Sequence, residues 1–345
     1  MSWYDDLFEG ETDWLAHTLA FAGQVTQPAS VVMADGTRIE RSGIGVLRLT
    51  PAQPEIDERL IVSAGVHGNE TAPIEVLNRL VNGLLSGEWA LRQEALLILG
   101  NPCAMVAGSR FVEHNLNRLF SGAHQKAPYA GSEEARRAAW LESLCREFSE
   151  PAVAVVHYDL HTAIRPSKRE KFALYPFVPG RKVPNRQLAF LAESDVATLL
   201  LQHQAGTTFA SFSSTELGAE SFTIELGQVR PFGQNDLTRF AGIEASLKAL
   251  LSQQPIVTES DGGMADMAVF EVVEEIINTG DSFRFHVPDD VANFTEYPPG
   301  KVIWEDDTRC YRVGDQAEAI VFPNPNVPVG QRVGLMVRRT PLLRD

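Results

Sequence analysis

Two histidines of this chain lie at points where a strand is expected to end, and the first belongs to the segment His67-Gly-Asn-Glu70. An imidazole and a carboxylate, both good zinc donors, are three residues apart here. Residues 59–66 before them are almost continuously apolar, which favours a buried strand, and a helix is expected from about Thr71. We expect His67 and Glu70 to point at one spot, with Gly68 allowing a sharp turn. A capped helix start with an incidental histidine is the alternative.

The second histidine, His161, follows the apolar run at residues 152–156 in the segment Tyr158-Asp-Leu-His161-Thr. Together with His67 and Glu70 it would complete a set of two imidazoles and one carboxylate, which is the ligand class of catalytic zinc sites that keep a fourth position for water. A histidine at the edge of the core, satisfied by backbone hydrogen bonds, is the alternative. Two separate strand ends supply matching donors, which favours one zinc ion per chain, although cobalt or manganese could occupy the same donors.

A further acidic residue, Glu225, lies near the end of the apolar run Phe222-Thr-Ile-Glu-Leu-Gly227. A buried carboxylate without a partner is unfavourable, so this position needs an explanation. An ion pair with an arginine such as Arg230 is one explanation. The other is a general base, because zinc lowers the pKa of a bound water to about 7 and a nearby carboxylate can accept its proton.

A basic residue, Arg110, lies in the polar segment 108–120, after another expected strand that ends at Gly100-Asn-Pro102. Arginine is the side chain best suited to bidentate recognition of a carboxylate. It could also stabilise the oxyanion that forms when a carbonyl is attacked. The alternative is an arginine on a surface loop.

The elements that must position these residues alternate between strands and helices over roughly the first 250 residues. Apolar runs predict strands at residues 31–33 and 37–39, joined by a turn at Asp35-Gly36, and at 44–49, 59–66, 95–99, 152–159 and 221–226. Helical spacing predicts helices from residue 71 to about 84, after Ser132, over 188–201 and around 237–247. This order predicts an α/β fold with a largely parallel sheet.

The composition changes near residue 254, where residues 254–263 read as a linker. Strand-like runs separated by turns follow at residues 268–273, 281–287, 301–304, 319–322 and 333–337. We therefore predict a catalytic domain over residues 1–254 and a smaller, β-rich domain over residues 255–345.

The overall charge and the cysteines exclude several classes of function. The 345 residues carry a formal charge of −15 and no dense run of Lys or Arg, which disfavours a nucleic-acid partner. The three cysteines, Cys103, Cys145 and Cys310, form no CxxC pair and predict neither a disulfide framework nor a cysteine zinc site. No signal peptide or membrane span is recognisable, so we expect a cytoplasmic protein. The sequence leaves the oligomeric state open, with a homo-oligomer possible.

In combination, the motifs resemble the succinylglutamate desuccinylase and aspartoacylase branch of the zinc carboxypeptidase-like superfamily. The matching segments, in order, are His67-x-x-Glu70, Arg110 with Asn117-Arg118 seven and eight residues on, Leu160-His161, Ile224-Glu225 and Asn293-Phe-Thr-Glu-Tyr297-Pro. The resemblance covers nearly the whole chain and implies a mixed, largely parallel carboxypeptidase-like sheet flanked by helices, with a β domain appended.

The resemblance also implies roles for individual residues. His67, Glu70 and His161 would bind zinc, and Glu225 would be the base. Arg110 would contact the oxyanion and a substrate carboxylate, Asn117 and Arg118 would clamp the α-carboxylate of the amino acid, and Tyr297 would reach the site from the C-terminal domain.

The activity that the resemblance implies is hydrolysis of a small anionic N-acyl amino acid: N-succinyl-L-glutamate to succinate and L-glutamate, at the end of arginine degradation by the succinyl route. Such a substrate carries three carboxylates, and Arg165, Lys168 and Arg230 are candidates for further cations. The alternatives are an aspartoacylase-like amidohydrolase with another substrate such as N-acetylaspartate, a peptide carboxypeptidase, and a zinc-stabilised binding protein without catalysis.

Overall fold

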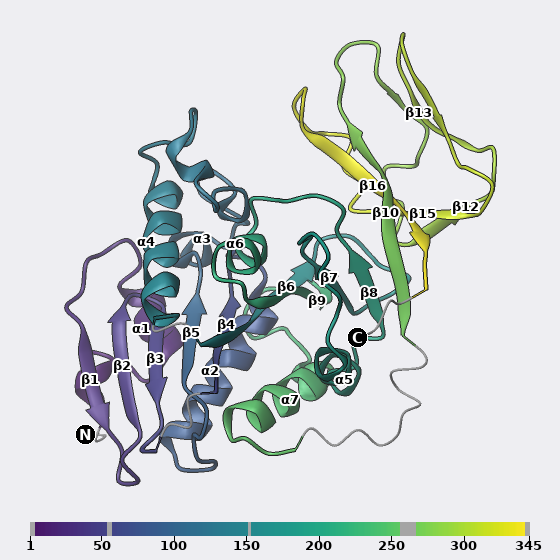
Figure 1. Cartoon of the computed structure of the whole chain (residues 1–345). Helices are drawn as coiled ribbons and strands as arrows, with labels where there is room; N and C mark the ends of the chain where they lie inside the picture. The colour runs from purple at the N-terminus through teal and green to yellow at the C-terminus, as the bar shows by residue number, and fades with distance from the viewer. Residues whose placement is uncertain (1–3, 54–56, 151–152, 256–266, 342–345) are drawn as a thin grey trace.

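The central element of the protein is a large mixed β-sheet, shown in the computed structural model of Figure 1, which describes residues 4–53, 57–150, 153–255 and 267–341. Over these residues the sheet has 13 strands in the order β1-β2-β3-β5-β4-β6-β9-β7-β8-β10-β16-β15-β12. In chain order they are β1 Ala29–Val32, β2 Arg38–Gly43, β3 Val46–Thr50, β4 Glu58–Ala64, β5 Ala95–Leu99, β6 Ala154–Ala163, β7 Phe172–Tyr175, β8 Thr198–Leu201, β9 Glu220–Gln228, β10 Ala268–Ile277, β12 Thr295–Tyr297, β15 Glu318–Val321 and β16 Arg332–Arg339. A small sheet contains β11 Arg284–Phe285, β13 Val302–Glu305 and β14 Cys310–Arg312.

Parallel pairing is concentrated at the centre of the large sheet, where β5, β4, β6 and β9 run in the same direction. Their apolar sequences suit strands that are covered on both faces. Along β4, Leu60 and Val62 belong to one apolar cluster and Ile61 to another, because successive side chains point to opposite faces. The predicted α/β fold, a mixed sheet between helices, is confirmed.

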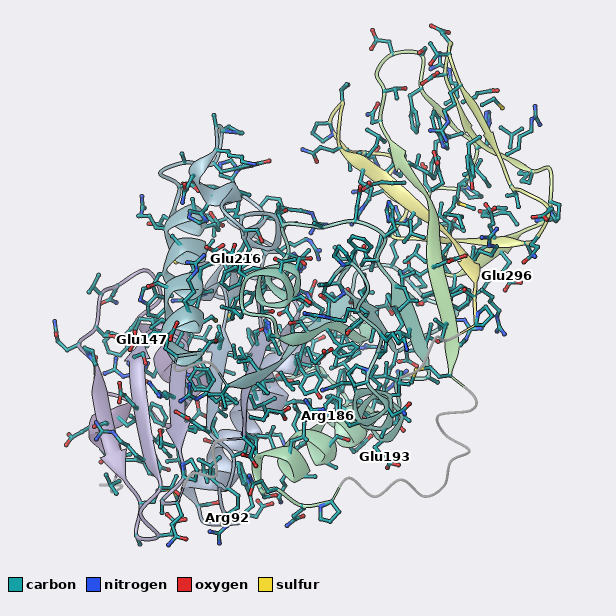
Figure 2. The ribbon with its side chains drawn as sticks, viewed as in Figure 1. Arg92, Glu147, Arg186, Glu193, Glu216 and Glu296 are labelled. Carbon is teal, nitrogen blue, oxygen red and sulfur yellow. The ribbon has the colours of Figure 1, made fainter. Side chains whose placement is uncertain are left out.

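The two apolar clusters correspond to two layers of helices. On one face lie α1 Trp14–Ala20, α2 Thr71–Leu85, α5 Asn185–Glu193 and α7 Ala241–Leu251, and on the other α4 Glu133–Phe148 and α6 Phe209–Glu216. The short elements are α3 Pro102–Val106, η1 Asp5–Leu7, η2 Leu116–Arg118, η3 Ala123–Gln125 and η4 Leu237–Phe240. Charged side chains such as Glu147, Arg186 and Glu296 are exposed (Figure 2).

Helix α2 follows directly from the residues expected to do chemistry, and its own sequence explains why it forms there. Pro73 lies in the first turn, where its missing N–H is tolerated, and Ile74, Leu77 and Val81 are buried on one face. Burial of each such side chain contributes about 1.5–3 kcal/mol relative to exposure. This packing holds the N-terminus of α2 in place against the end of β4.

The C-terminal strands continue the large sheet. Strand β10 pairs in parallel with β8 on one side and antiparallel with β16 on the other. Apolar residues from both parts of the chain share one cluster, in which Phe172 and Leu200 pack with Phe270 and Phe294. The C-terminal β-rich region is confirmed, and in Figure 1 it projects from the end of the sheet opposite to β1.

The predicted boundary between residues 254 and 255 stays a prediction. The predicted linker at residues 254–263 lies outside the described residues from residue 256 onward. Described residues on either side of it belong to different elements, since α7 ends at Leu251 and β10 begins at Ala268.

The single helix predicted over residues 188–201 is wrong in its second half. Helix α5 ends at Glu193, Asp195 adopts a left-handed conformation with φ 61°, and Thr198–Leu201 forms strand β8. The run Thr-Leu-Leu-Leu has no polar side, so its periodicity cannot distinguish a buried strand from a helix. Pairing with β7 and β10 decides the structure. The sequence patterns also missed α1, α6, β7, β12 and β14, all short elements.

Candidate metal centre

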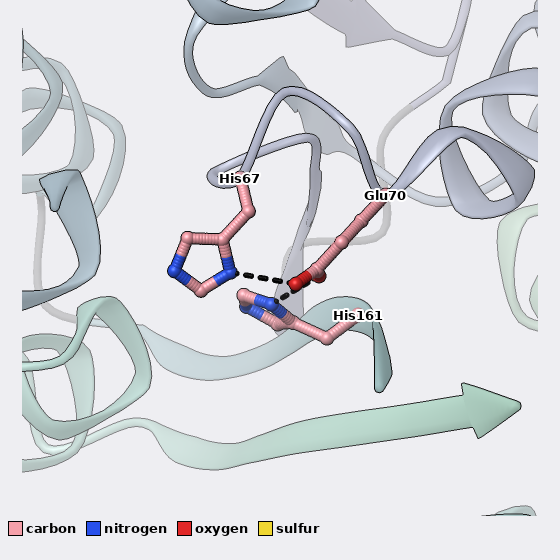
Figure 3. A group of neighbouring side chains, drawn as sticks. All are labelled: His67, Glu70 and His161. Carbon is pink, nitrogen blue, oxygen red and sulfur yellow. Dashed lines mark hydrogen bonds and ion pairs between the residues drawn. The ribbon is translucent and has the colours of Figure 1, made fainter. Parts of the chain in front are cut away.

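Three predicted metal ligands meet at the carboxyl ends of the central parallel strands (Figure 3). His67 lies in the turn after β4, and Glu70 is the residue immediately before α2. His161 lies near the end of β6, which pairs in parallel with β4. The Glu70 side chain makes no capping hydrogen bond to α2, because it points into the site instead.

The donor atoms of the three residues lie close enough to share one ion. One nitrogen or oxygen from each lies within 4.8 Å of the others, and all three side chains are buried. The His67 Nδ1 atom is 2.9 Å from Glu70 Oε1, and the His161 Nδ1 atom is 2.8 Å from Glu70 Oε2. Two imidazoles and one carboxylate are the donor set of catalytic zinc sites, so these residues fit a zinc ion.

The charged groups around the three donor residues favour the binding of a cation. Burial opposes protonation of His161, but Asp159 and Glu70 raise its pKa well above the ordinary value. Burial would raise the pKa of Glu70, yet the neighbouring His67 and His161 hold it well below the usual range. Burial and the Arg110 charge lower the pKa of His67 to about 4, which leaves that imidazole neutral. A neutral imidazole is the form that binds metal.

Two polar residues that the sequence analysis did not single out orient the histidines. Asp159 Oδ2 lies 2.9 Å from His161 Nε2, and Asn115 Oδ1 lies 3.0 Å from His67 Nε2. Both acceptors favour a proton on Nε2, which leaves Nδ1 of each ring free to bind the ion. Asp159 could have been found from the sequence, because it lies two residues before His161 and residues two apart in a strand lie on the same face. Asn115 could not.

The turn that carries the ligands depends on two glycines, which act in different ways. Gly65 has φ +63°, the left-handed conformation that turns the chain. Gly68 does not have a positive φ, and its role is steric instead. A Cβ atom there would lie 2.2 Å from the backbone carbonyl carbon of Ala104 in α3, so only glycine fits.

Glu225 lies beside the three donors. It is 8% exposed, and its Oε2 atom is buried with no hydrogen-bond partner among the described residues. Burial, followed by the Glu70 charge, raises the pKa of Glu225 to about 7. The ion pair with Arg230 that was the alternative does not occur among the described residues. A carboxylate of this kind can exchange a proton near neutral pH.

The polar segment between α3 and α4 brings Arg110 to the site and holds the predicted clamp next to it. Arg110 Nη1 donates to Glu70 Oε1 at 2.7 Å. Asn117 is buried, and its Oδ1 atom accepts from the Phe209 N–H at 2.9 Å, so its side-chain oxygen is already used in fixing the start of α6. Its Nδ2 group is the part of the amide that could donate to a substrate.

The charges of other cationic side chains act on Arg118. Its side chain donates to the Asn117 carbonyl at 2.9 Å, and the residue is exposed. Removal of water from around its guanidinium lowers the pKa of that group to about 9. The charges of Arg332 and Arg110 lower this pKa as well. Arg332 is the first residue of β16, so a cation of the C-terminal region acts on the predicted clamp.

Comparison with known proteins identifies the family of this chain. Residues 56–251 match the model of the succinylglutamate desuccinylase/aspartoacylase catalytic domain, and residues 265–340 match the AstE/AspA barrel-sandwich hybrid domain. The chain belongs to the succinylglutamate desuccinylase/aspartoacylase family. Succinylglutamate desuccinylase of Shewanella frigidimarina is 41% identical over 332 residues, which cover 95% of this chain and 96% of the relative.

Solved structures of this family share the whole architecture. The succinylglutamate desuccinylase of Vibrio parahaemolyticus has a TM-score of 0.86 at 32% identity, with 95% of each chain covered. That of Chromobacterium violaceum has a TM-score of 0.84 at 36% identity, with 96% of this chain and 99% of the other covered.

Among the described helices, none has both the length and the apolar character needed to cross a membrane.

The hybrid domain of the family meets the catalytic domain through the loop that follows β6. The Lys168 N–H donates to the Asn293 carbonyl at 3.0 Å, the Asn293 N–H donates to the Pro166 carbonyl at 2.9 Å, and Arg165 donates to the Asp289 carbonyl. Tyr297 in β12 packs beside the apolar cluster of the hybrid domain, and burial raises its pKa. Its predicted role at the site stays a prediction.

Two of the three additional cations considered from the sequence line a cavity beside the end of β9. This cavity has a volume of about 440 Å³, and Arg165, Arg230 and Arg239 are among its lining residues. Leu226 and Gly227, which directly follow Glu225, line it as well. Lys168 is exposed and does not line this cavity.

Proposed function

We propose that the protein hydrolyses N-succinyl-L-glutamate to succinate and L-glutamate in a zinc-dependent reaction. The observation that carries this proposal is the buried set of His67, Glu70 and His161 with the unpartnered Glu225 carboxylate beside it. The 41% identity to succinylglutamate desuccinylase over 95% of the chain supports the choice of substrate.

The protein residues divide the work of amide hydrolysis between them. His67, Glu70 and His161 would hold the zinc ion, which would supply Lewis-acid chemistry when bound. Glu225 accepts a proton from the water that adds to the carbonyl carbon. It then returns this proton to the nitrogen as the carbon–nitrogen bond breaks, which releases the amine of glutamate and the new carboxylate of succinate.

Arg110 stabilises the negative charge that develops on the carbonyl oxygen. Its guanidinium donates to Glu70 Oε1 at 2.7 Å, and its side chain remains partly exposed. Preorganised donors aimed at a developing oxyanion typically contribute about 2.7–4 kcal/mol to catalysis. The ion pair with a metal ligand holds the guanidinium in place before the substrate arrives.

The charges of the substrate require several cations on a protein whose formal charge is −15. N-succinyl-L-glutamate carries three carboxylates. Arg118, with the Asn117 amide, binds the α-carboxylate, and Arg332 of β16 provides a further cation nearby, because its charge acts on Arg118. Arg165 and Arg230, which line the cavity beside the end of β9, bind another carboxylate.

Three further features belong to the same proposal. The ion is zinc, one per chain, because two imidazoles and one carboxylate are the donor set of catalytic zinc sites. The protein acts in the cytoplasm, in keeping with three free cysteines at Cys103, Cys145 and Cys310. It acts as a monomer or a homo-oligomer on a small molecule, without a nucleic-acid partner.

The test is release of succinate from N-succinyl-L-glutamate, with N-acetylaspartate, N-succinylarginine and a set of peptides as competing substrates. We expect turnover of N-succinyl-L-glutamate, loss of turnover with a chelator and recovery with added zinc. Preferred turnover of N-acetylaspartate would support an aspartoacylase-like enzyme instead, and cleavage of peptides would support a carboxypeptidase. Full activity after complete metal removal would refute the metal-dependent reaction.

A further inference from the structure

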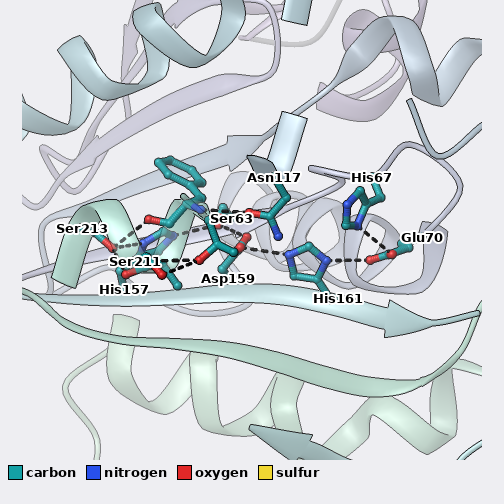
Figure 4. A network of polar contacts seen from close by, with 12 residues as sticks. Ser63, His67, Glu70, Asn117, His157, Asp159, His161, Ser211 and Ser213 are labelled. Atoms are coloured by element: carbon teal, nitrogen blue, oxygen red, sulfur yellow. Dashed lines mark hydrogen bonds and ion pairs between the residues drawn. The ribbon is translucent and has the colours of Figure 1, made fainter. Parts of the chain in front are cut away.

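A chain of buried polar side chains leads from the metal centre into the protein (Figure 4). His161 Nε2 lies 2.9 Å from Asp159 Oδ2, and Asp159 Oδ1 accepts from the Ser63 hydroxyl at 2.6 Å. Ser63 Oγ lies 2.8 Å from His157 Nε2, and His157 Nδ1 lies 2.7 Å from Ser213 Oγ. None of these five side chains is more than 2% exposed.

The proton on each member of this chain can be assigned from the two ends. Both oxygens of the Asp159 carboxylate face donors, since Oδ2 lies beside His161 Nε2 and Oδ1 accepts from Ser63. The single hydroxyl proton of Ser63 therefore points to Asp159. The oxygen of Ser63 then needs a donor, which must be the N–H at His157 Nε2.

The second nitrogen of His157 completes the assignment. Burial lowers the pKa of His157 to about 4, so the imidazole is neutral and Nδ1 carries a lone pair. Ser213 Oγ lies 2.7 Å from Nδ1, closer than to the carbonyls of Ala210 and Phe209 at 3.2 and 3.3 Å, so its hydroxyl donates to Nδ1. Ser213 Oγ also lies 2.8 Å from Ser221 Oγ. From Ser213 onward, every donor in the chain points toward the Asp159 carboxylate.

The far end of the chain lies on two elements that also carry functional residues. Ser221 belongs to β9, the strand of Glu225, and Ser213 belongs to α6. The first N–H of α6, that of Phe209, donates to Asn117 Oδ1 at 2.9 Å. The same buried contacts therefore connect the strand of a metal ligand, the strand of the base and the helix that fixes the clamp.

We propose that Ser63, His157 and Ser213 are positioning residues for the metal centre, which hold the Asp159 carboxylate in place as an acceptor and thereby keep His161 in the orientation that presents Nδ1 to the ion. The proposal rests on the metal site of the proposed function, but not on the identity of its substrate. Hydrogen bonds arranged in one direction polarise one another, and residues of this kind around a metal ligand typically change metal affinity by roughly 10- to 100-fold.

The direct test is the affinity for zinc, measured by competition with a chromogenic chelator. We expect S63A and H157F each to lower zinc affinity roughly 10- to 100-fold. S194A is the matched control, since Ser194 is a buried serine whose hydroxyl donates to a backbone carbonyl, that of Phe190. It should lose stability without losing zinc affinity. Unchanged zinc affinity in both S63A and H157F would refute the proposal.

A double-mutant comparison separates action through Asp159 from general destabilisation. In a D159N background the chain no longer has a charged acceptor, so S63A should lower zinc affinity by much less than it does in the native chain. Full additivity would contradict the proposal. Succinate release is measured alongside: a protein that fails to hydrolyse N-succinyl-L-glutamate, but shows the expected zinc affinities, would refute the substrate and leave the positioning role intact.

Nitrogen NMR of the unaltered protein gives a readout that does not depend on how the variants fold. The side chain of His157 should be neutral at pH 7, with the proton on Nε2 and none on Nδ1. A proton on Nδ1 would reverse the direction of the chain and refute the proposal.

Discussion

His161 and Glu225 are paired neighbours across the parallel strands β6 and β9. Paired residues of adjacent strands project from the same face of the sheet, so a proposed metal ligand and the proposed base are set side by side by backbone hydrogen bonds. Neither position depends on a mobile surface loop. The arrangement explains how a carboxylate can be buried without a partner of its own, since the rigid sheet and the adjacent cation site hold it there.

Replacement of Glu225 by glutamine should separate chemistry from metal binding. The amide has the same shape but cannot accept the proton of water, so kcat should fall roughly 100- to 10,000-fold. Zinc content and the zinc dissociation constant should stay close to those of the native protein, because Glu225 is not one of the three ligands. Steady-state kinetics and metal analysis check this, and E225Q with native kcat would remove Glu225 from the mechanism.

Gly68 should not tolerate even one additional methyl group. In G68A the new Cβ atom would lie 2.2 Å from the Ala104 carbonyl carbon, so α3 and the turn carrying His67 must separate. We expect a loss of roughly 1–3 kcal/mol in the free energy of unfolding and weaker zinc binding. G314A is the control, because the new atom there meets Glu318 Oε1 at an ordinary 3.4 Å. Equal behaviour of the two variants in urea unfolding would contradict this account.

The proposed site residues could be picked out from the sequence because each lies at or just after the end of an apolar run, and such runs indicate where strands end. His67, Glu70, His161 and Glu225 all stand at such points, and the structure brings them together. Asn115 could not be found this way, because its contact with His67 depends on how a long polar segment folds back. A contact of this kind leaves no periodic pattern of residues in the sequence.

The parts of the fold that could not be predicted from the sequence also depend on contacts between distant residues. The α/β order of the first part and the β-rich C-terminal part follow from local periodicity. The parallel pairing of β8 with β10, which joins the two parts in one sheet, is a long-range contact that no local pattern encodes. For the same reason residues 198–201, apolar throughout, could be recognised as a strand only from their neighbours.

A histidine far from the site should make the protein sensitive to acid. His17 is fully buried in α1, and neither ring nitrogen has a partner among the described residues. Burial, followed by the Arg41 charge, lowers the pKa of His17 to about 4. The unfolded chain therefore binds this proton near pH 6.5 and the folded protein does not, so the free energy of unfolding falls as the pH drops from about 6.5 to about 4.

The variant H17F isolates this contribution, because the ring of His17 already stacks on Phe21 with centroids 4.9 Å apart. We expect H17F to be more stable than the native protein at pH 5 by roughly 1–2 kcal/mol beyond any difference at pH 8. Urea unfolding at both pH values measures it. Other histidines contribute equally to both proteins and cancel in the comparison. An identical pH dependence of the two proteins would contradict the assignment.

Arg118 and Arg332 should be distinguishable by which carboxylate of the substrate each one binds. A charge-assisted hydrogen bond contributes about 1.5–3 kcal/mol, so R118A and R332A should each lower kcat/KM for N-succinyl-L-glutamate roughly 10- to 100-fold. N-acetyl-L-glutamate lacks the carboxylate of the acyl group but keeps both carboxylates of glutamate. Arg118, as the clamp on the α-carboxylate, should therefore matter equally for the two substrates.

The kinetics of R332A on the two substrates then show whether Arg332 binds the carboxylate of the acyl group. If Arg332 binds the succinyl carboxylate, R332A should weaken turnover of N-succinyl-L-glutamate but change turnover of N-acetyl-L-glutamate little, because the partner charge is already missing. R38A is the control, since the exposed Arg38 of β2 is held in an ion pair with Glu40 and lines neither the metal centre nor the cavity. Native kinetics of R332A on both substrates would exclude Arg332 from the site and leave the remaining carboxylate to the arginines of the cavity beside Glu225.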